Sequence, residues 1–362
     1  MLTFFLQEIH MKAWAVVKNG VPLESIDMPS REPRGTEVKL KVTHCGVCHS
    51  DLHFWKGSYD MGGGKLMLLA ERGVLLPRAP GHEIVGRVIQ TGPDAQGVAI
   101  GDMRIVFPWL GCGQCAPCLD GQDNTCDKPN IIGVMQNGGF AEEVMVPHSK
   151  FLVDMGDIDP ALAATFACSG ITVYSAIKKI MPLASSDPVV LIGAGGLGLA
   201  AISMLLALGH HNIISVDTSA EKRAAALEMG ASQAVDGAGD NVAALVLDAA
   251  GGPVKAVLDF VNASSTAQTG LDCLAKGGKL ILIGIAGGEL VISLAGMVFK
   301  PRTIQGSATG NPQDLRDVVA LARAGKLKPI PITVMPKDQA NTALQMLHHG
   351  QVKGRIVLSG VA

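Results

Sequence analysis

The sequence predicts two domains of different class: an all-β module in the form of a partly open barrel, then a doubly wound parallel α/β sheet. Short alternating segments broken by Gly and Pro run from Met11 to about Val106, and they favour the β module. From Pro188 onward, apolar strands alternate with helical segments, as in βαβ units. The 362 residues are enough for two such domains, each with its own core.

The first module is expected to contain several short strands. The run from Glu37 to Thr43 alternates with period two, which predicts one buried face and one solvated face. The strands are predicted at residues 12–17, 37–44, 84–91 and 104–108, with another alternating strand in 139–146.

The second module opens with Val189–Ile192, a continuous apolar run typical of a strand buried on both faces. Further strands are predicted at 212–217, near 235, and at 257–260, 279–285 and 303–306. Helices are predicted up to residue 208 and near 220–229, 241–249 and 266–275. The tail from Asn311 to Ala362 is predicted to hold helices at 312–324 and 338–348 and a final strand at 354–358, and to return to the first domain.

A glycine-rich turn between the first apolar strand and its helix predicts a dinucleotide site. Its members are Gly193, Gly195, Gly196, Leu197 and Gly198. Asp217 lies 19 residues after Gly198, where an acid that binds the ribose hydroxyls is expected. A carboxylate there repels a 2′-phosphate, so NAD is favoured over NADP. Lys222 and Arg223 soften this preference or are simply solvated helix charges.

Cys48, His82 and Cys168 form one candidate metal site. Two sulfurs and one imidazole leave a fourth position open, which is typical of a catalytic zinc. Because these residues are far apart in the sequence, a turn histidine and a small core cysteine are an equal alternative from spacing alone.

Cys112, Cys115, Cys118 and Cys126 form a second candidate, C-x2-C-x2-C-x7-C. Four thiolates so close together predict a closed, tetrahedral zinc site, and a pair of disulfides is the alternative. Cys45 and Cys273 remain, and we expect them to be reduced, which suits the cytoplasm.

Composition argues against two classes of partner. The net charge is −2, the pI is about 6.5 and aromatics make up 4% of the chain, so neither nucleic acid nor an anionic membrane is an expected partner. The apolar stretch from Leu197 to Leu208 is too short to span a bilayer. Residues 1–10 lack the features of a signal peptide and are expected to be an N-terminal extension without a role in the core.

The segment from Gly57 to Pro80 fits no regular pattern. It holds three consecutive glycines (62–64) and an apolar run at 66–70. A long irregular connection in a compact domain is usually functional, so a wall of the substrate entrance is one hypothesis and a surface or subunit-contact excursion is the other.

Over nearly all of residues 11–358 the chain resembles the zinc-dependent alcohol dehydrogenases of the medium-chain dehydrogenase/reductase superfamily. The resemblance is carried by GVCHSDLH (46–53), GHE (81–83), the four-cysteine stretch (112–126), ACSGITVYSA (167–176), GAGGLG (193–198) and VD (216–217). It implies a GroES-like β-barrel catalytic domain at 11–165, a Rossmann NAD-binding domain at 166–308, and a return to the catalytic domain at 309–362.

The resemblance also implies roles for individual residues. Cys48, His82 and Cys168 would hold the catalytic zinc, with Glu83 beside it as a neighbour or transient ligand and Asp51 orienting a ligand. The four clustered cysteines would hold a structural zinc.

The proton path and the pocket come from the same resemblance. Ser50 would take the proton of the alcohol, and His53 would pass it to solvent through the ribose. His49 and Arg355 would lie near the cofactor phosphates. Trp55 and Trp109 fall where substrate-pocket aromatics are usual, although either could be core.

The predicted activity is reversible oxidation of a primary or secondary alcohol, a small-molecule substrate, with hydride transfer to NAD, by a homodimer or homotetramer with two zinc ions per chain. A polyol or CoA-linked cyclic alcohol dehydrogenase is an alternative, and Lys65, Arg72 and Arg78 could meet an anionic substrate. A non-catalytic protein that binds nucleotide and zinc is a further alternative, disfavoured because such a protein needs no proton relay.

Overall fold

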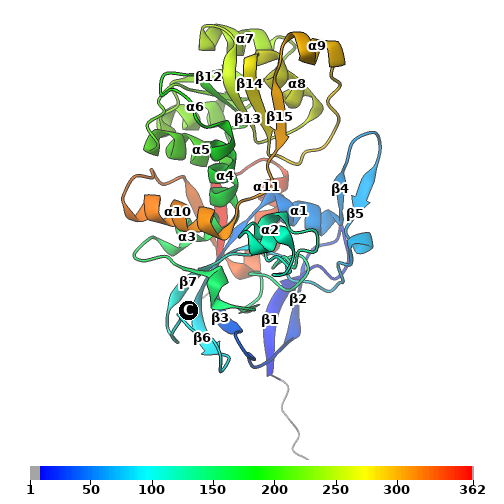
Figure 1. Ribbon diagram of the computed structural model, residues 1–362. Helices are drawn as coiled ribbons and strands as arrows, with labels where there is room; N and C mark the ends of the chain where they lie inside the picture. Colours follow the sequence, from blue (N-terminus) through cyan, green and yellow to red (C-terminus); the bar gives the residue numbers. More distant parts are fainter. Residues whose placement is uncertain (1–8, 361–362) are drawn as a thin grey trace, which may run out of the picture.

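The chain folds around two sheets, one mostly antiparallel and one parallel, which lie in the lower and upper parts of Figure 1. The computed structural model describes residues 9–360. Residues 1–8, most of the predicted extension, lie outside the described residues. The first strand, β1 (Ile9–Ala15), begins earlier than predicted, so His10 already belongs to it.

The upper sheet has the order β12-β11-β10-β13-β14-β15, and all of its neighbours are parallel. Its strands are β10 (Val189–Ile192), β11 (Ile213–Asp217), β12 (Gln233–Asp236), β13 (Val254–Asp259), β14 (Leu274–Leu282) and β15 (Thr303–Gly306). Its helices are α5 (Gly196–Ala207), α6 (Ala220–Met229), α7 (Val242–Ala250), α8 (Ser264–Cys273) and the unpredicted α9 (Leu294–Phe299). This arrangement confirms the doubly wound α/β fold.

The lower sheet has the order β16-β17-β3-β6-β7-β9, with β8 also paired to β3. Its strands are β3 (Val38–Val47), β6 (Glu83–Thr91), β7 (Met103–Val106), β8 (Glu143–Val146), β9 (Leu152–Asp154), β16 (Ile332–Pro336) and β17 (Arg355–Ser359). A separate pair joins β1 to β2 (Glu24–Ser30). The GroES-like β class predicted for this half of the chain is thus confirmed.

One detail of β3 was predicted wrongly. Val38, Leu40 and Val42 are buried as expected, but Lys39 is buried too, at 4% exposure. Its ammonium donates to the Ser30 hydroxyl at 3.0 Å and lies 3.6 Å from the Glu143 carboxylate. Cross-strand polar partners therefore compensate for its burial, and the outer face is not fully solvated.

The C-terminal segment comes back to the lower sheet. Its helices are α10 (Pro312–Arg323) and α11 (Ala340–His348), and its last strand, β17, pairs antiparallel with β3 and parallel with β16. This pairing sets Ile356 opposite Val47 and Val357 opposite Gly46, next to the first candidate metal ligand.

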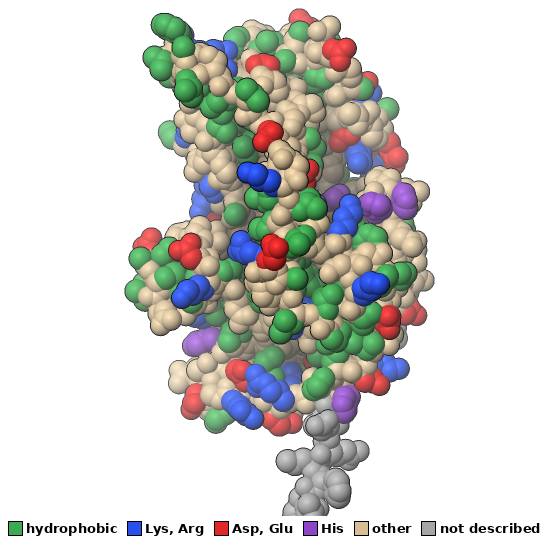
Figure 2. Space-filling model, turned by 90° about the vertical axis from the view of Figure 1, so that its right-hand side faces the viewer, with side chains coloured by type: hydrophobic (Ala, Val, Ile, Leu, Met, Phe, Trp, Pro, Cys, Tyr) green, Lys and Arg blue, Asp and Glu red, His purple; other side chains and the backbone are tan. Residues whose placement is uncertain are grey.

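Apolar side chains gather at the upper end of the molecule, over the parallel-sheet domain (Figure 2). The exposed large ones in residues 291–299 are Val291, Ile292, Leu294, Val298 and Phe299. They lie close in sequence to β15, which is the last strand of its sheet and pairs only with β14 among residues 9–360.

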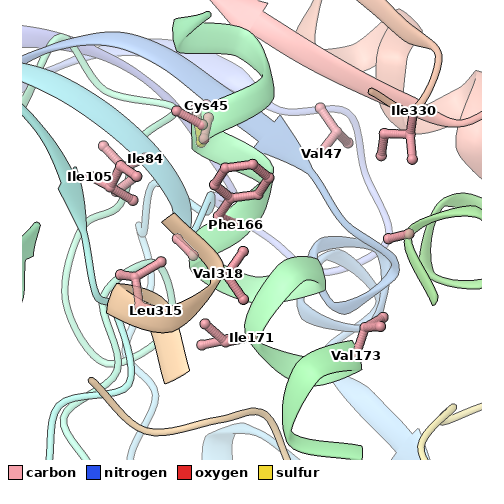
Figure 3. Packing of buried hydrophobic residues seen from close by; sticks show 14 of the residues in the cluster. Cys45, Val47, Ile84, Ile105, Phe166, Ile171, Val173, Leu315, Val318 and Ile330 are labelled. Atoms are coloured by element: carbon pink, nitrogen blue, oxygen red, sulfur yellow. The ribbon is translucent and has the colours of Figure 1, made fainter. Parts of the chain in front are cut away.

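A continuous helical segment joins the two halves. It comprises α3 (Pro160–Thr165), a π-helical turn (Phe166–Gly170) and α4 (Ile171–Ile180). Phe166 and Ile171 from this segment pack with Ile84 from β6 and Val318 from α10 in one core (Figure 3). The segment is long and apolar enough to cross a membrane, but 83% of its apolar window is buried inside the protein, which marks a core helix.

The segment 57–80 is more regular than predicted. β4 (Ser58–Asp60) and β5 (Leu66–Leu68) form an antiparallel hairpin, and a 3-10 turn follows at Ala70–Arg72. The hairpin rises from the lower domain beside the upper one (Figure 1). Gly62, Gly63 and Gly64 all have positive φ, a backbone conformation that glycine adopts without steric cost.

Candidate active site and metal centres

Cys48 lies where β3 ends and α1 (His49–Lys56) begins. It is the N-cap residue of α1, and its backbone N–H donates to Asp51 Oδ2 at 2.9 Å. Gly46, two residues earlier, has no room for a side chain because the Glu83 side chain fills that space. The strand end and the first helical turn therefore hold the Cys48 thiol in a fixed position.

Cys48, His82 and Cys168 come together in the structure. Their ligand atoms all lie within 4.8 Å of one another, and all three residues are buried. They come from three separate elements: the end of β3, the residue before β6, and the π-helical turn. This is the three-ligand cluster.

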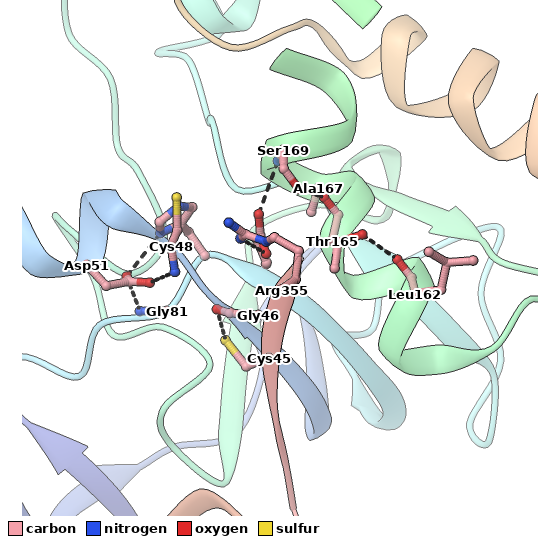
Figure 4. Close-up of polar contacts among 12 residues, drawn as sticks. Cys45, Gly46, Cys48, Asp51, Gly81, Leu162, Thr165, Ala167, Ser169 and Arg355 are labelled. Atoms are coloured by element: carbon pink, nitrogen blue, oxygen red, sulfur yellow. Dashed lines mark hydrogen bonds and ion pairs between the residues drawn. The ribbon is translucent and has the colours of Figure 1, made fainter. Parts of the chain in front are cut away.

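The imidazole of His82 is oriented by Asp51. Its Nδ1 lies 3.2 Å from Asp51 Oδ1, which also accepts the N–H of Gly81 at 3.1 Å (Figure 4). The other ring nitrogen, Nε2, is buried and has no hydrogen-bond partner. A buried, unpartnered imidazole nitrogen within reach of two thiol sulfurs fits a zinc ion, for which these are preferred ligands.

Glu83 and Arg355 form a buried ion pair next to this cluster. Arg355 Nη2 donates to Glu83 Oε2, and the N–H of Ser169 donates to Glu83 Oε1 at 3.1 Å (Figure 4). Burial raises the pKa of Glu83, while the Arg355 charge opposes that change. The stem of Arg355 fills the space beside Gly196, so the residue joins the glycine-rich turn to the metal cluster. Its role at the phosphates remains a prediction.

Ser50 and His53 are three residues apart on α1, so they lie on the same face of the helix. The His53 ring stacks on Tyr59 of β4, with centroids 4.7 Å apart and planes inclined by 18°. Burial lowers the pKa of His53 from its ordinary value of 6.5, and the charge of Lys56 acts in the same direction. His53 is therefore held neutral over most of the physiological pH range, as a proton acceptor requires.

His49 and Lys222 approach the same region from different domains. Burial lowers the pKa of His49, and the positive charges of Arg355 and Lys222 lower it further. Since His49 begins α1 and Lys222 lies on α6, these two residues are within electrostatic reach across the gap between the domains.

The two tryptophans have different surroundings. Trp109 Nε1 donates to the carbonyl of Ala167 at 3.1 Å, and its ring meets the His82 ring edge-on at 5.3 Å, next to the three-ligand cluster. Trp55 packs against the core: its Nε1 donates to the carbonyl of Val21 at 2.6 Å, and its ring lies against His348. These contacts favour the core alternative, and its role in the substrate pocket stays a prediction.

The aromatic residue that sequence reasoning missed is Tyr59. It lines a cavity of about 470 Å³ between the β4–β5 hairpin and the upper domain. Burial raises the pKa of Tyr59, and the charges of Cys48 and Asp51 act in the same direction. Tyr59 is stacked on His53 of the proposed proton path. The sequence gives no motif or periodic pattern around Tyr59 that would have marked it as a pocket residue.

The four-cysteine cluster occupies the loop around α2 (Ala116–Leu119). The sulfurs of Cys112, Cys115, Cys118 and Cys126 lie within 4.8 Å of one another, and all eight cysteines of the chain are free thiols. The backbone N–H groups of Cys112 and Lys128 each donate to Cys126 Sγ at 3.3 Å. Such bonds favour the thiolate, so the donor set fits a closed zinc site and not the disulfide alternative.

The glycine-rich turn lies between β10 and α5. Gly193 has φ +99, and a side chain on Gly198 would collide with the carbonyl of Gly193. Asp217 at the end of β11 receives the N–H of Ala194 on Oδ2 at 2.8 Å and that of Ser219 on Oδ1 at 2.9 Å. The carboxylate therefore closes one side of this turn. Arg223 is bound to Asp236 at 3.0 Å.

Comparison with known families assigns both halves of the chain. Residues 34–157 match the alcohol dehydrogenase GroES-like domain, and residues 196–324 match the zinc-binding dehydrogenase family. An NAD-dependent alcohol dehydrogenase of Sulfurisphaera tokodaii is 36% identical over 353 residues, which is 96% of this chain and 99% of that protein.

Two further relatives bear on the chemistry. The crystal structure of the alcohol dehydrogenase of Aeropyrum pernix is 30% identical, with a TM-score of 0.88 over 96% of this chain and 99% of that one. A D-arabinose 1-dehydrogenase (NADP(+)) of Saccharolobus solfataricus is 33% identical over 97% of this chain and 98% of that protein.

Proposed function

The chain belongs to the family of zinc-binding, NAD-dependent alcohol dehydrogenases, and on that basis we propose which residues carry its activity. The enzyme oxidises a primary or secondary alcohol to an aldehyde or ketone, reversibly, with Cys48, His82 and Cys168 holding the catalytic zinc. The unpartnered, buried Nε2 of His82 beside two thiols is the observation that supports this assignment best.

Zinc, when bound, supplies a Lewis acid for the alcohol oxygen, and NAD accepts the hydride. The chain contributes position and proton transfer. Ser50 accepts the proton of the alcohol, and His53, kept neutral by burial and held against Tyr59, passes it toward solvent. Asp51 fixes the orientation of His82, and Trp109 shields the cluster on one side.

The cofactor is NAD, bound across the carboxyl ends of the parallel strands. The glycine-rich turn 193–198 approaches the pyrophosphate, assisted by His49 and by Arg355 beside Gly196. Asp217 faces the adenosine ribose and disfavours a 2′-phosphate. Arg223 is engaged by Asp236, so the one basic residue left for that position is Lys222.

Two zinc ions per chain are proposed. One occupies the three-ligand cluster with an open position, and the other occupies the four-cysteine cluster. The second cluster lies near the junction of the domains, because Asn124 donates to the carbonyl of Ala308 at 3.1 Å and Asn311 donates to Gln122 at 3.2 Å. Its metal therefore stabilises the position of α10 relative to the loop.

Among the alternatives, the polyol is favoured over the CoA-linked alcohol. The D-arabinose relative acts on a polyhydroxylated substrate. None of the basic residues of the long segment, Lys65, Arg72 and Arg78, lines the cavity, whose charged residues are Asp60 and Glu289. An anionic CoA-linked substrate would meet acidic groups there.

A homodimer through the outer edge of β15 is the proposed assembly, and a homotetramer would need a further contact. The exposed apolar side chains at 291–299 lie beside that edge, and an edge strand can pair with its copy about a two-fold axis. Light scattering on the purified protein should give a dimer or larger, and Val298→Lys with Phe299→Lys should give a monomer. A wild-type monomer would contradict the assembly.

A cytoplasmic location accords with eight unpaired cysteines, six of them in the metal clusters. Cell fractionation is the direct measurement. Recovery of the protein in an extracellular fraction would contradict the proposal.

The activity is tested by following NADH formation with a panel of alcohols and polyols, before and after dialysis against a chelator. We expect turnover that chelation abolishes and added zinc restores. Cys168→Ser should lose both activity and one zinc, whereas Cys273→Ser, a buried cysteine on α8 outside both clusters, should keep both. Full activity in Cys168→Ser would exclude the three-ligand cluster from the reaction.

A further inference from the structure

The β4–β5 hairpin and the upper domain enclose the 470 Å³ cavity between them. Tyr59, Met61 and Met67 line it from the hairpin, and Leu282, Ile285 and Leu290 line it from the segment after β14. These six side chains are mainly apolar, and methionines adapt to ligands of different shape. Asp60 and Glu289 are the charged residues of the lining.

The hairpin is docked on the upper domain through glycines. A Cβ placed on Gly62 would lie 2.6 Å from the carbonyl oxygen of Gly288 and 2.6 Å from Glu289 Cγ. A Cβ on Gly287 would lie 2.7 Å from Asp60 Cβ. These distances are too short for real side chains, so the two backbones approach each other closely only because glycine stands on both sides.

The loop that receives the hairpin is itself anchored. The N–H of Glu289 donates to the hydroxyl of Ser264, the first residue of α8, at 2.8 Å. The docked hairpin thus rests on a segment tied to the parallel-sheet domain. The hairpin belongs to the segment that connects Cys48 to His82, so a connection between two proposed metal ligands contacts the other domain.

Tyr59 links the cavity to the proposed proton relay. Tyr59 stacks on His53 at one end of the cavity, as described above. Asn262 and Leu282, from the segments that follow or end β13 and β14, line it as well. In a doubly wound sheet, ligands bind at the carboxyl ends of the strands, so the cavity lies on the side of the sheet where the cofactor is proposed to bind.

We propose that the docked hairpin forms an outer substrate subsite that takes the extended, uncharged apolar substituent of an alcohol. This inference rests on the proposed function, because the hydroxyl must lie at the three-ligand cluster. Each methylene buried between the hairpin methionines and the segment after β14 should raise kcat/KM about fourfold. Asp60 and Glu289 should disfavour a substrate that carries a carboxylate at its far end.

Two glycine variants test the subsite as a matched pair. Gly62→Ala places a methyl group against the Gly288 backbone, whereas Gly64→Ala meets nothing within 4 Å. The two positions have φ +80 and φ +72, so the backbone strain of an alanine is nearly equal in the two variants. Any difference between them reports on hairpin docking and not on strain in the turn.

The measurement is kcat/KM for ethanol, 1-butanol, 1-hexanol and 1-octanol. In the wild type and in Gly64→Ala we expect kcat/KM to rise once the chain is long enough to reach the hairpin. In Gly62→Ala this rise should flatten. We expect kcat/KM for 1-octanol to fall roughly 15- to 60-fold, which corresponds to the loss of two to three buried methylenes. We expect kcat/KM for ethanol to change less than about twofold. Equal chain-length profiles in the two variants would overturn the subsite.

Two further measurements separate the rival explanations. If Gly62→Ala weakens NADH binding while the ratio of octanol to ethanol stays the same, the cavity belongs to the cofactor and the inference is wrong. With 8-hydroxyoctanoate in place of 1-octanol, we expect a lower kcat/KM in the wild type. Glu289→Gln keeps the shape of the side chain and removes its charge, so the ratio of kcat/KM for 1-octanol to that for 8-hydroxyoctanoate should fall about threefold. An unchanged ratio would show that the charge of Glu289 does not affect selectivity.

Failure of the proposed function is distinguishable from failure of the subsite. A wild type that oxidises none of these alcohols, ethanol included, defeats the proposed function. Calorimetric binding of 1-octanol to the wild type and both variants then decides the subsite. We expect weaker binding to Gly62→Ala alone, and equal affinity in all three proteins would overturn the inference.

Discussion

Replacing Asp51 by Asn should loosen the proposed catalytic zinc while the fold persists. The Asp51 side chain is 1% exposed, and its two carboxylate oxygens act as hydrogen-bond acceptors. Its Oδ2 accepts the N–H of Cys48 at 2.9 Å, and its Oδ1 accepts that of Gly81 at 3.1 Å and lies 3.2 Å from His82 Nδ1. Two of these partners belong to proposed zinc ligands, and the third immediately precedes one.

An asparagine cannot satisfy all three groups. Whichever way its amide is turned, its NH2 group faces either the N–H of Cys48 or the N–H of Gly81. A buried donor left without an acceptor costs about 1–3 kcal/mol of folding stability. Loss of an orienting partner typically weakens metal binding by about 10–100-fold, or about 1.4–2.8 kcal/mol.

The assay is a competition between the protein and a chromogenic chelator that reports each zinc released. Asp314→Asn is the control, because Asp314 is 2% exposed and accepts the N–H of Asn311 at 3.0 Å, and no proposed zinc ligand is among its partners. We expect both variants to melt at lower temperature, and only Asp51→Asn to release its first zinc more readily. Equal zinc affinity in the two variants would refute the orienting role of Asp51.

Three further predictions concern other parts of the proposed site. Cys112→Ser should bind one zinc instead of two and melt at lower temperature, as elemental analysis and calorimetry would show; two zincs in the variant would contradict it. Asp217→Ser should raise the ratio of kcat/KM with NADP to that with NAD, and a wild type that already prefers NADP would exclude the role given to Asp217. Ser50→Ala should lower kcat by roughly 10²–10⁴-fold and His53→Gln by less, since water can replace a relay group nearer solvent. Because burial lowers the pKa of His53 below 6.5, alcohol oxidation should fall with acid only below that pH, and this limb of the pH profile should vanish in His53→Gln.

The parallel-sheet domain was predictable from local pattern. Its strands are short apolar runs, and the turn after β10 shows its glycines in the sequence at the spacing that the backbone needs. The helix α6 was predicted with the residues that it has, because Ser219 caps its start and Gly230 ends it with φ +115.

The hairpin and the π-helical turn carry no comparable signal. β4 and β5 have three residues each, too few for a period, and the hairpin rests on Gly288 more than 200 residues away. Cys168 lies in a π-helical turn whose departure from the α-helical repeat leaves no mark in the sequence.

The surroundings of Trp55 follow from a helix that the sequence analysis did not predict. Once α1 is known, Ser50 and His53 share a face, and Trp55, two residues beyond His53, must point elsewhere. Cys48 followed three residues later by Asp51 was a signature of the helix start that could have revealed it.

The late position of β17 bears on how the protein is made. As the chain leaves the ribosome, β10 to β15 of the upper sheet are complete by residue 306, whereas residues 44–47 of β3 lack their partner strand β17 until residues 355–359 emerge. The half that is synthesised first therefore finishes folding last: the end of β3 lacks β17, and Glu83 lacks Arg355, which follows it by 272 residues. During that interval, the thiols of the first half are exposed before their final strand is in place, so we expect the four-cysteine loop, whose ligands all lie within 15 residues, to load its metal before the three-ligand cluster does.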